Sequence, residues 1–395
     1  MKRLAIINSH LNSQTEICIV AVGRSPIQKA GGEFKNLSAT DLAGQIISGT
    51  LKKYQIDPSH IQEFYMGCVN STNLGQNPAK QAALKAGLND KTNCMSINKL
   101  CASAMKALTL GCLSIQSSNT DCVLIGGSES MSNYPYLLSL RNGISNKVRD
   151  SLDHDTLQDA VIKENAVKIS DHVSSYLKLS KAELDAYAVT SCDLAFSSSD
   201  KGKFVKEIIP ITLPKTKQII SKDALKSSKT IKSLNPIYKS GTTSSGNACG
   251  LNDGASCMVL CSRAKAQKEQ WKVLGTIKSF ADAEQESRMF PLSPSLAINK
   301  ALKTSGINIT QVDFMELNEP FSCVVLGNAK ILNYPVEKIN VYGGALSLGH
   351  PVGSSGCRIV ITLLNILKQE KGRIGVAGIC NGAGGATAVV IKVED

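Results

Sequence analysis

The sequence predicts an α/β protein made of two similar halves, with a loop-rich segment inserted into the chain. Short apolar runs rich in β-branched residues alternate with segments that carry apolar residues at helical spacing. Residues 128–240 break this alternation, because they carry more serine, lysine and charge and few strand-like runs. The chain has 395 residues, which is enough for a large buried core.

Before residue 128 the apolar pattern alternates between strands and helices. Strands are predicted at residues 17–22, 63–69 and 121–126. Helices are predicted at residues 38–53 and 102–116. Ser38 or Thr40 provides the N-cap of the first helix, since a side-chain hydroxyl accepts a hydrogen bond from the first turn.

The alternation resumes after the inserted segment, in which only residues 205–213 look like a strand. Further strands are predicted at residues 255–261, 271–280, 314–317, 339–342, 374–379 and 388–393. Glycine pairs at 126–127 and 343–344 each follow a strand and hint at an internal repeat. The predicted division is an N-terminal extension (1–15), an N-terminal half (16–127 and 241–270), an inserted segment (128–240) and a C-terminal half (271–395).

Composition excludes several classes of function. The net charge is +12, but the lysines are scattered and form no basic run or zinc-finger spacing, so anionic metabolites fit better than nucleic acid. No stretch approaches the roughly 18 apolar residues that a membrane span needs. The 13 cysteines show no CxxC pair or disulfide spacing and predict a reducing compartment, and with only five histidines no metal site is expected.

The first fifteen residues carry Lys2 and Arg3 and several hydroxyl or amide side chains, without an acidic residue. This composition is weakly similar to a mitochondrial transit segment. A frayed N-terminus explains it equally well.

Four short segments concentrate the reactive residues. Cys101 stands where an extended segment meets a helix, and unpaired N–H groups at a helix N-terminus lower a thiol pKa and favour a nucleophilic thiolate. The alternative is an inert core cysteine. His350 lies in a glycine-studded loop, residues 343–356, where it is either held beside a ligand or merely structural.

The other two segments each follow a predicted strand. Cys380 ends one strand and leads into the turn at 381–385, whose N–H groups are suited to an oxyanion, although a plain tight turn has the same sequence pattern. Asn318 and Glu319 follow the strand at 314–317. The structural alternative for that pair is a helix cap and first turn with Pro320 near the first helical position.

Together these segments, in this order, resemble the thiolase family, and most of all its acetoacetyl-CoA members of the mitochondrial type. The resemblance covers nearly the whole chain, from Thr15 to Val393. The matching stretches are residues 98–107, 130–133, 184–188, 251–255, 318–321, 349–351 and 380–382.

The resemblance implies a five-layer αβαβα fold, an insert that binds coenzyme A, and a homodimer or homotetramer. Cys101 would be the nucleophile that carries the acyl group, His350 would activate it, and Cys380 would be the general acid and base. One oxyanion hole would use His350 with a water held by Asn318. The other would use the backbone N–H groups of Cys101 and Gly382.

The same resemblance implies the substrates and the location. They are acetyl-CoA, acetoacetyl-CoA and coenzyme A itself, with no permanently bound cofactor. Ala248, Cys249 and Phe290 match positions at the coenzyme A site, and Cys249 replaces a serine that usually touches pantetheine. The mitochondrial matrix is the first expected location and the cytosol the second.

The chain also departs from the family pattern. The family's His-Met-Gly segment falls on Asn165-Ala166-Val167, and the aromatic that helps to hold potassium falls near Val161. These losses leave a second reading open, in which the chain is a thiolase-derived assembly subunit of a larger complex with impaired coenzyme A binding. A scaffold has no need for two reactive thiols beside a histidine, so the enzyme is the favoured reading.

Overall fold

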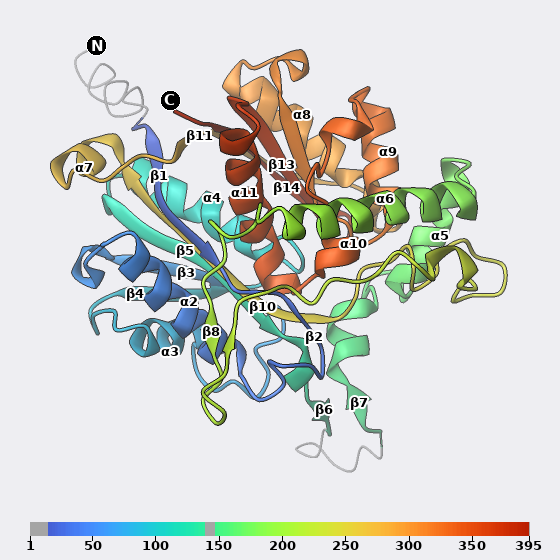
Figure 1. Ribbon diagram of the computed structural model, residues 1–395, viewed down its shortest axis with the longest axis horizontal. Helices are drawn as coiled ribbons and strands as arrows, with labels where there is room; N and C mark the ends of the chain where they lie inside the picture. The colour runs from blue at the N-terminus through green and yellow to red at the C-terminus, as the bar shows by residue number, and fades with distance from the viewer. Residues whose placement is uncertain (1–14, 139–146, 395) are drawn as a thin grey trace.

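The computed structural model of the protein describes residues 15–138 and 147–394, so most of the predicted N-terminal extension lies outside the described residues (Figure 1). Within these residues one large mixed sheet forms the core of the molecule. Its strands run in the order β12 (Phe314–Leu317), β13 (Ile374–Asn381), β14 (Gly385–Lys392), β11 (Gly275–Glu284), β1 (Ile17–Arg24), β10 (Asn252–Ser262), β5 (Cys122–Ser130), β3 (Glu63–Gly67) and β4 (Asn93–Ile97). A short strand, β2 (Gln28–Lys29), pairs with β10.

Strand β1 joins the two halves of the chain. It pairs antiparallel with β10 along its whole length, and its first three residues also pair with the start of β11. The strands before this junction belong to the C-terminal half, and those after it belong to the N-terminal half. Each half therefore supplies one region of a continuous sheet.

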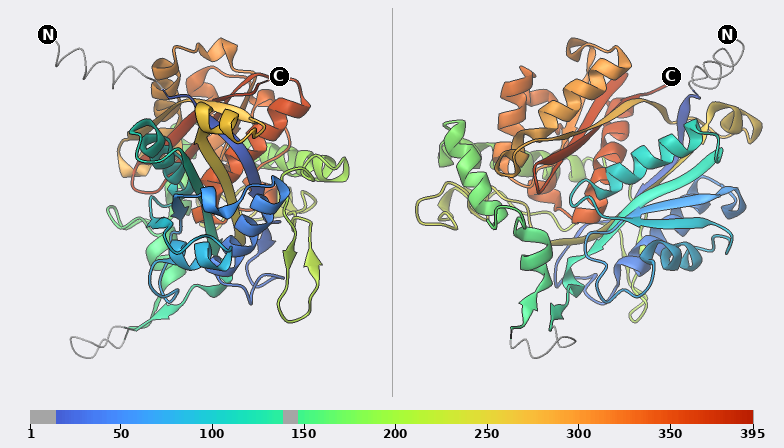
Figure 2. Two further views of the ribbon diagram at one scale, coloured as in Figure 1. Left: turned by 90° about the vertical axis from the view of Figure 1, so that its left-hand side faces the viewer. Right: turned by 180° about the vertical axis from the view of Figure 1, so that it is seen from behind.

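Helices divide the core into five layers (Figures 1 and 2). The outer layers are α2 (Ala39–Lys53) with α3 (Pro78–Lys85) on the N-terminal half, and α8 (Ser293–Ser305) with α9 (Ser322–Leu332) on the C-terminal half. Between the two sheet regions lie α4 (Ser103–Gln116) and α11 (Val352–Gln369), which share one apolar cluster with strands of both halves. The predicted αβαβα layering is confirmed.

The inserted segment is mostly helical and irregular. Its elements are β6 (Tyr136–Leu137), β7 (Arg149–Asp150), η3 (Asp153–Leu157), α5 (Ala166–Tyr176), α6 (Lys181–Asp200), β8 (Ile211–Thr212), β9 (Ile219–Ile220) and η4 (Ile231–Ser233). The long helix α6 packs against the C-terminal half through Tyr187, Ala188 and Cys192. The insert also contains η2 (Met131–Asn133), and the short helices outside it are η1 (Pro58–His60), α7 (Arg263–Lys268), η5 (Ser287–Leu292), η6 (Ile309–Gln311), η7 (Val336–Lys338) and α10 (Ala345–Leu348).

Two predicted strands are wrong. Within residues 205–213 only Ile211–Thr212 is a strand, because the preceding residues form consecutive turns that direct Glu207 inward to Arg24. Residues 339–342 keep a single bridge, from Ile339 to Met315. Asn340 ends any strand there, since its φ is +51° and its side chain bonds the backbone of Leu317 instead.

Two predictions about helix starts have different outcomes. Ser38 is the N-cap of α2 and accepts the N–H of Asp41 at 3.1 Å, as expected. Pro320, by contrast, is not in the first turn of a helix, because α9 begins at Ser322. Pro320 lies in a bend just before the isolated bridge between Phe321 and Ala248, and its carbonyl accepts the N–H of Cys249 at 2.9 Å.

No helix in the described part of the chain combines the length and the apolar character that a membrane span requires.

Candidate active site

The site lies where the two central helices begin. The first turns of α4 and α11 are in direct contact, and a Cβ on Gly356 would meet the backbone nitrogen of Met105 at 2.5 Å. Cys101 lies just before α4, and His350 lies just before α11. The helix packing therefore brings the segments that carry these two residues to one edge of the central layer.

The backbone around Cys101 is tightly held. Leu100 has φ +49°, a left-handed conformation that costs a non-glycine residue about 1 kcal/mol or more. The side chain of Asn98 accepts the N–H of Leu100 at 2.9 Å, and the Ser103 hydroxyl donates to the Leu100 carbonyl. These bonds keep the loop around Cys101 in its strained conformation.

A network between the halves anchors the same loop. The Lys99 ammonium contacts Asp282 at 2.7 Å, and Lys106 of α4 contacts the other carboxylate oxygen at 2.6 Å. Thr387 of β14 also donates to Asp282, at 2.6 Å. The loop that bears Cys101 is thus fastened to strands β11 and β14 of the opposite half.

The expectation of a resting thiolate at Cys101 is wrong. Burial raises the pKa of Cys101 to about 12, although the backbone N–H groups of Cys101 and Gly382 act in the opposite direction. Desolvation therefore outweighs the effect of the helix N-terminus. The thiol needs a base to react.

His350 is 3% exposed and rigidly held. Its Nδ1 lies 2.6 Å from the Ser355 hydroxyl, and its backbone N–H donates to the side chain of Asn252 at 3.1 Å. Burial lowers the pKa of His350 to about 3, and the positive charge of Arg358 acts in the same direction. The imidazole is therefore neutral at physiological pH and available to accept a proton.

Asn318 lies beside His350 at the end of β12. Its Nδ2 is 3.4 Å from the imidazole Nε2. Its Oδ1 is buried and has no hydrogen-bond partner among the described residues. A buried acceptor of this kind is stabilised by a bound water or a substrate group.

Cys380 and the turn after it complete the group. Cys380 is the second-last residue of β13, is fully buried, and has a pKa well above its ordinary value because of burial and because Cys101 is near. Gly382 follows in the turn, with its N–H directed at the Cys101 thiol. The structure thus brings together Cys101, Cys380 and Gly382, which lie far apart in the sequence.

The residues expected at the coenzyme A site lie next to this group. Ala248 and Phe290 belong to the apolar cluster that buries Cys380. Cys249 is half-buried. Burial raises the pKa of its thiol to about 12, and the nearby Cys101 acts in the same direction. The Lys226 ammonium holds this segment by donating to the Ala248 carbonyl at 2.7 Å and to two carbonyls before it.

The segment that replaces the family's His-Met-Gly begins helix α5. Asn165 is the N-cap, and its side chain accepts the N–H of Val167 at 3.0 Å. Ala166 and Val167 pack against the cluster around Cys380. This segment therefore still covers the site, with apolar surface and a helix cap in place of the imidazole.

A buried carboxylate, Glu129, also lies near the site and was not predicted from the sequence. It is fully buried and accepts the N–H groups of Val69 at 2.9 Å, Asn70 at 3.1 Å and Gly353 at 2.9 Å. Burial raises the pKa of Glu129 to about 7, although these hydrogen bonds act to lower it. It braces the start of α11, and nothing in the local sequence distinguishes it.

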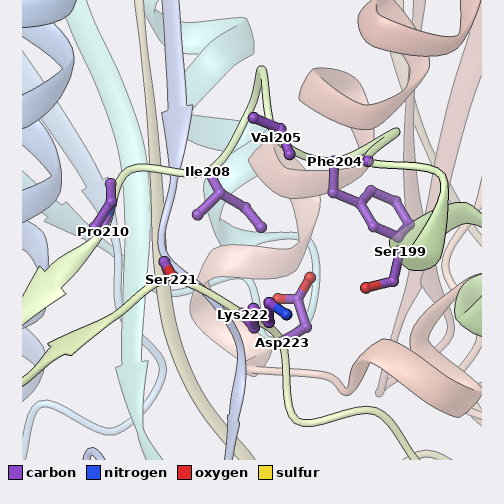
Figure 3. A pocket seen from close by; sticks show the side chains of 9 residues that line it. Ser199, Phe204, Val205, Ile208, Pro210, Ser221, Lys222 and Asp223 are labelled. Carbon is purple, nitrogen blue, oxygen red and sulfur yellow. The ribbon is translucent and has the colours of Figure 1, made fainter.

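A separate hollow of about 270 Å³ contains none of these residues (Figure 3). Phe204 and Ile208 lie on one side of it, facing Asp223 on the other. The Asp223 carboxylate is already paired with Arg24 at 2.8 Å and is 2% exposed. The hollow therefore offers no unpaired carboxylate to a ligand.

Comparison with protein families decides the classification. The model of the thiolase N-terminal domain matches residues 17–264, and that of the thiolase C-terminal domain matches residues 271–393. The chain belongs to the thiolase family.

Individual thiolases match along nearly their whole length. This thiolase is 42% identical to the acetyl-CoA acetyltransferase of Schizosaccharomyces pombe, over 96% of this chain and 99% of that one. It is 39% identical to the cytosolic acetyl-CoA acetyltransferase ERG10 of Gibberella zeae, over 95% and 98%. The crystal structure of a thiolase from Ascaris suum in complex with coenzyme A superposes with a TM-score of 0.91 at 33% identity, over 96% and 100%.

Proposed function

We propose that this thiolase is an acetyl-CoA C-acetyltransferase, an acyltransferase that reversibly condenses two acetyl-CoA molecules into acetoacetyl-CoA and coenzyme A. The observation that carries the proposal is the convergence of two thiols, Cys101 and Cys380, beside the N–H of Gly382. Similarity to the two acetyltransferases supports the same reaction. Coenzyme A is substrate and product rather than a resident cofactor.

In the first half-reaction Cys101 takes the acetyl group. His350 removes the thiol proton, and the sulfur attacks the thioester carbonyl, so that a new thioester forms and coenzyme A leaves with a proton. The N–H groups of Cys101 and Gly382 stabilise the oxyanion. Because one thioester replaces another, the step is nearly balanced in free energy and reversible.

In the second half-reaction Cys380 supplies the base. Its thiol has given its proton to the departing coenzyme A, and the resulting thiolate, made strongly basic by burial, removes a proton from the methyl group of a second acetyl-CoA. The resulting enolate oxygen is stabilised by His350 and by a water at Asn318, and the carbon attacks the acetyl group on Cys101. The Cys101 thiolate leaves and is protonated again.

Coenzyme A would lie against the insert, residues 128–240, and the segment at Ala248 and Cys249. Phe290 and the residues that replace the His-Met-Gly segment give this surface an apolar character. The +12 net charge favours the phosphates of the ligand. The loss of one histidine thus removes a contact without opening the cluster that buries Cys380.

The proposal is tested by intact-protein mass spectrometry after brief exposure to acetyl-CoA, followed by peptide mapping. An acetyl adduct on Cys101 is expected, absent from the Cys101→Ala variant. Cys380→Ala should still form the adduct but produce no acetoacetyl-CoA. A folded wild type that takes no acetyl group at millimolar acetyl-CoA would support the assembly-subunit reading instead.

Assembly and location belong to the same proposal. A homodimer or homotetramer, alone or within a larger complex, is expected, and light scattering of the purified chain distinguishes these states. The mitochondrial matrix is the first expected location and the cytosol the second. Residues 1–15 fused to a fluorescent protein should enter mitochondria, whereas diffuse fluorescence would favour the cytosol.

A further inference from the structure

The turn between β13 and β14 holds the Gly382 N–H with an unusual backbone. Ala383 has φ +63° and Gly384 has φ +94°. Left-handed backbone at a residue with a side chain persists only where the surroundings support it. Part of the support is local, since the Gly384 carbonyl accepts the Ser293 hydroxyl at 2.7 Å and the Gln285 N–H at 3.0 Å.

The other support comes from the insert, through Asp159. This side chain is 8% exposed, and its Oδ2 accepts the N–H of Ala383 at 3.1 Å and the hydroxyl of Ser287. Its Oδ1 accepts the N–H groups of Val161 at 2.8 Å and Ile162 at 3.1 Å. One carboxylate therefore joins a loop of the insert to the turn beside Cys101.

The carboxylate is charged although it is buried. Burial would raise the pKa of Asp159, but the hydrogen bonds from Ser287, from its own loop and from Ala383 outweigh it and lower the pKa. Hydrogen bonds to a charged acceptor are stronger than those to a neutral one. The charged carboxylate of Asp159 therefore forms a stronger hydrogen bond with the Ala383 N–H than an amide oxygen would.

The loop that carries Asp159 is itself closed and anchored. The Asp159 N–H donates to the Glu164 carbonyl at 2.8 Å, which makes residues 159–164 a compact turn. The Glu164 carboxylate binds Arg288 through two bonds of 2.7 and 3.1 Å. The next residues are Asn165-Ala166-Val167, where the chain departs from the family pattern.

We propose that Asp159 is a positioning residue for acetylation of Cys101, which holds the Gly382–Ala383 turn so that the Gly382 N–H faces the developing oxyanion. The inference rests on the proposed function. It adds a direct mechanical link between the substrate-binding insert and the oxyanion hole. Asp159 acts through the turn and does not touch the reacting atoms.

The Asp159→Asn variant isolates this role. An amide keeps one acceptor oxygen, and its NH₂ group must face either Ala383 with Ser287 or the two N–H groups of the loop. On one side the NH₂ group then faces another hydrogen-bond donor. The hydrogen-bonded connection that Asp159 makes between the loop and the turn is therefore broken. Asp153→Asn is the matched control, because it makes the same chemical change on an exposed side chain of the insert outside the loop 159–164.

The experiment measures three quantities on the full-length chain. They are the rate of Cys101 acetylation at saturating acetyl-CoA, the KM for acetyl-CoA, and amide hydrogen exchange in the peptide that contains Ala383. For Asp159→Asn we expect acetylation 10- to 100-fold slower, somewhat less than the loss of a whole oxyanion donor, with KM changed less than threefold. Exchange at the turn should be at least tenfold faster, and Asp153→Asn should match the wild type in all three.

The outcomes separate this inference from the proposed function. Suppose that the wild type is acetylated. If Asp159→Asn then has the wild-type acetylation rate, or the wild-type hydrogen exchange at the turn, the positioning role is overturned. If the wild type takes no acetyl group, the proposed function is overturned, and Asp159 then has no role in catalysis. If Asp159→Asn does not fold, Ser287→Ala removes one donor from the same carboxylate oxygen and should slow acetylation two- to fivefold, and no effect there contradicts the proposal.

Discussion

The backbone N–H of Gly382 is directed at the thiol of Cys101, although the two residues belong to opposite halves of the chain. Cys101 follows the strained backbone of Leu100, and Gly382 precedes the left-handed residues Ala383 and Gly384. The Gly382 N–H and the Cys101 thiol are thus positioned by separate parts of the fold. Their alignment depends on how the halves pack, and this leads to four predictions.

Alkylation of Cys101 in the free protein should accelerate with pH without a plateau. The pKa of Cys101 is about 12 and that of His350 about 3, so the resting pair is a neutral thiol and a neutral imidazole. The thiolate fraction then grows about tenfold per pH unit below the thiol pKa. Iodoacetamide labelling of Cys101 between pH 6 and 9 measures this, and a plateau near pH 7 would indicate a preformed ion pair.

Removing the carboxylate of Asp282 should destabilise the fold in a pH-dependent way. Burial opposes its ionisation, but bonds from Lys106, Lys99 and Thr387 lower its pKa to about 2. A lowered pKa in the folded state means that the stabilisation is present above the unfolded value of 3.8 and disappears as the pH falls through 2. We expect about 1–2 kcal/mol at pH 6, because Asp282 is 34% exposed and partly screened.

Urea unfolding of wild type and Asp282→Asn at pH 6, 4 and 3 checks this expectation. The difference in unfolding free energy should be largest at pH 6 and decline toward pH 3. An equal difference at all three pH values would show that the loss of Asp282 acts through packing rather than charge.

Replacing Cys249 with serine should improve substrate binding without changing the chemistry. By its resemblance to the thiolase family, Cys249 is expected where a serine usually touches pantetheine, and a hydroxyl is a stronger hydrogen-bond donor than a thiol. One added neutral hydrogen bond stabilises by about 0.5–1.5 kcal/mol, so KM should fall roughly two- to tenfold. Steady-state kinetics test this, and kcat should stay within twofold of the wild type if Cys249 takes no part in bond making.

Glu319→Gln should destabilise the protein more than surface substitutions do. Its Oε1 accepts from Tyr187 and Asn340, and its Oε2 accepts from Ser191 and the N–H of Leu346, at 2.6–3.0 Å. The hydroxyl groups can reverse direction, but the Asn340 amide group and the Leu346 N–H always donate. A glutamine NH₂ therefore faces a fixed donor in either orientation.

The expected loss for Glu319→Gln is about 2–4 kcal/mol of unfolding free energy. Denaturant unfolding measures it, with the exposed Glu337→Gln as the control, which should change stability by less than about 0.5 kcal/mol. If both variants unfold at the same denaturant concentration, Glu319 does not hold α6 to the residues around 340.

Elements with a strong local pattern were predicted well. The strand at 314–317 and the helix that Ser38 caps agree with the structure, because apolar spacing and a capping hydroxyl are local signals. Residues 339–342 have the composition of a strand but make a turn. There the side chain of Asn340 bonds the neighbouring strand, a contact that only the tertiary structure reveals.

Short motifs predicted which residues are candidates for the site. The sequence did not predict the environment of these residues. The position of Cys101 before a helix could be predicted, but the pKa of its thiol depends on desolvation by segments distant in the sequence. Asp159 and Glu129 act through backbone N–H groups of remote loops, and a single acidic residue in a sequence carries no sign of such partners. Contacts of this kind arise only when the halves are assembled.

The position of β1 between β10 and β11 has a consequence for how the protein is made. This strand is among the first parts of the described chain to be synthesised, yet both of its neighbours begin more than 220 residues later, at Asn252 and Gly275. At about 5–20 residues per second, a ribosome needs on the order of ten to fifty seconds to supply them. During that time the nascent chain exposes an apolar strand without its pairing partners. A chaperone that binds this strand early would cover it until β10 and β11 are available to pair with it.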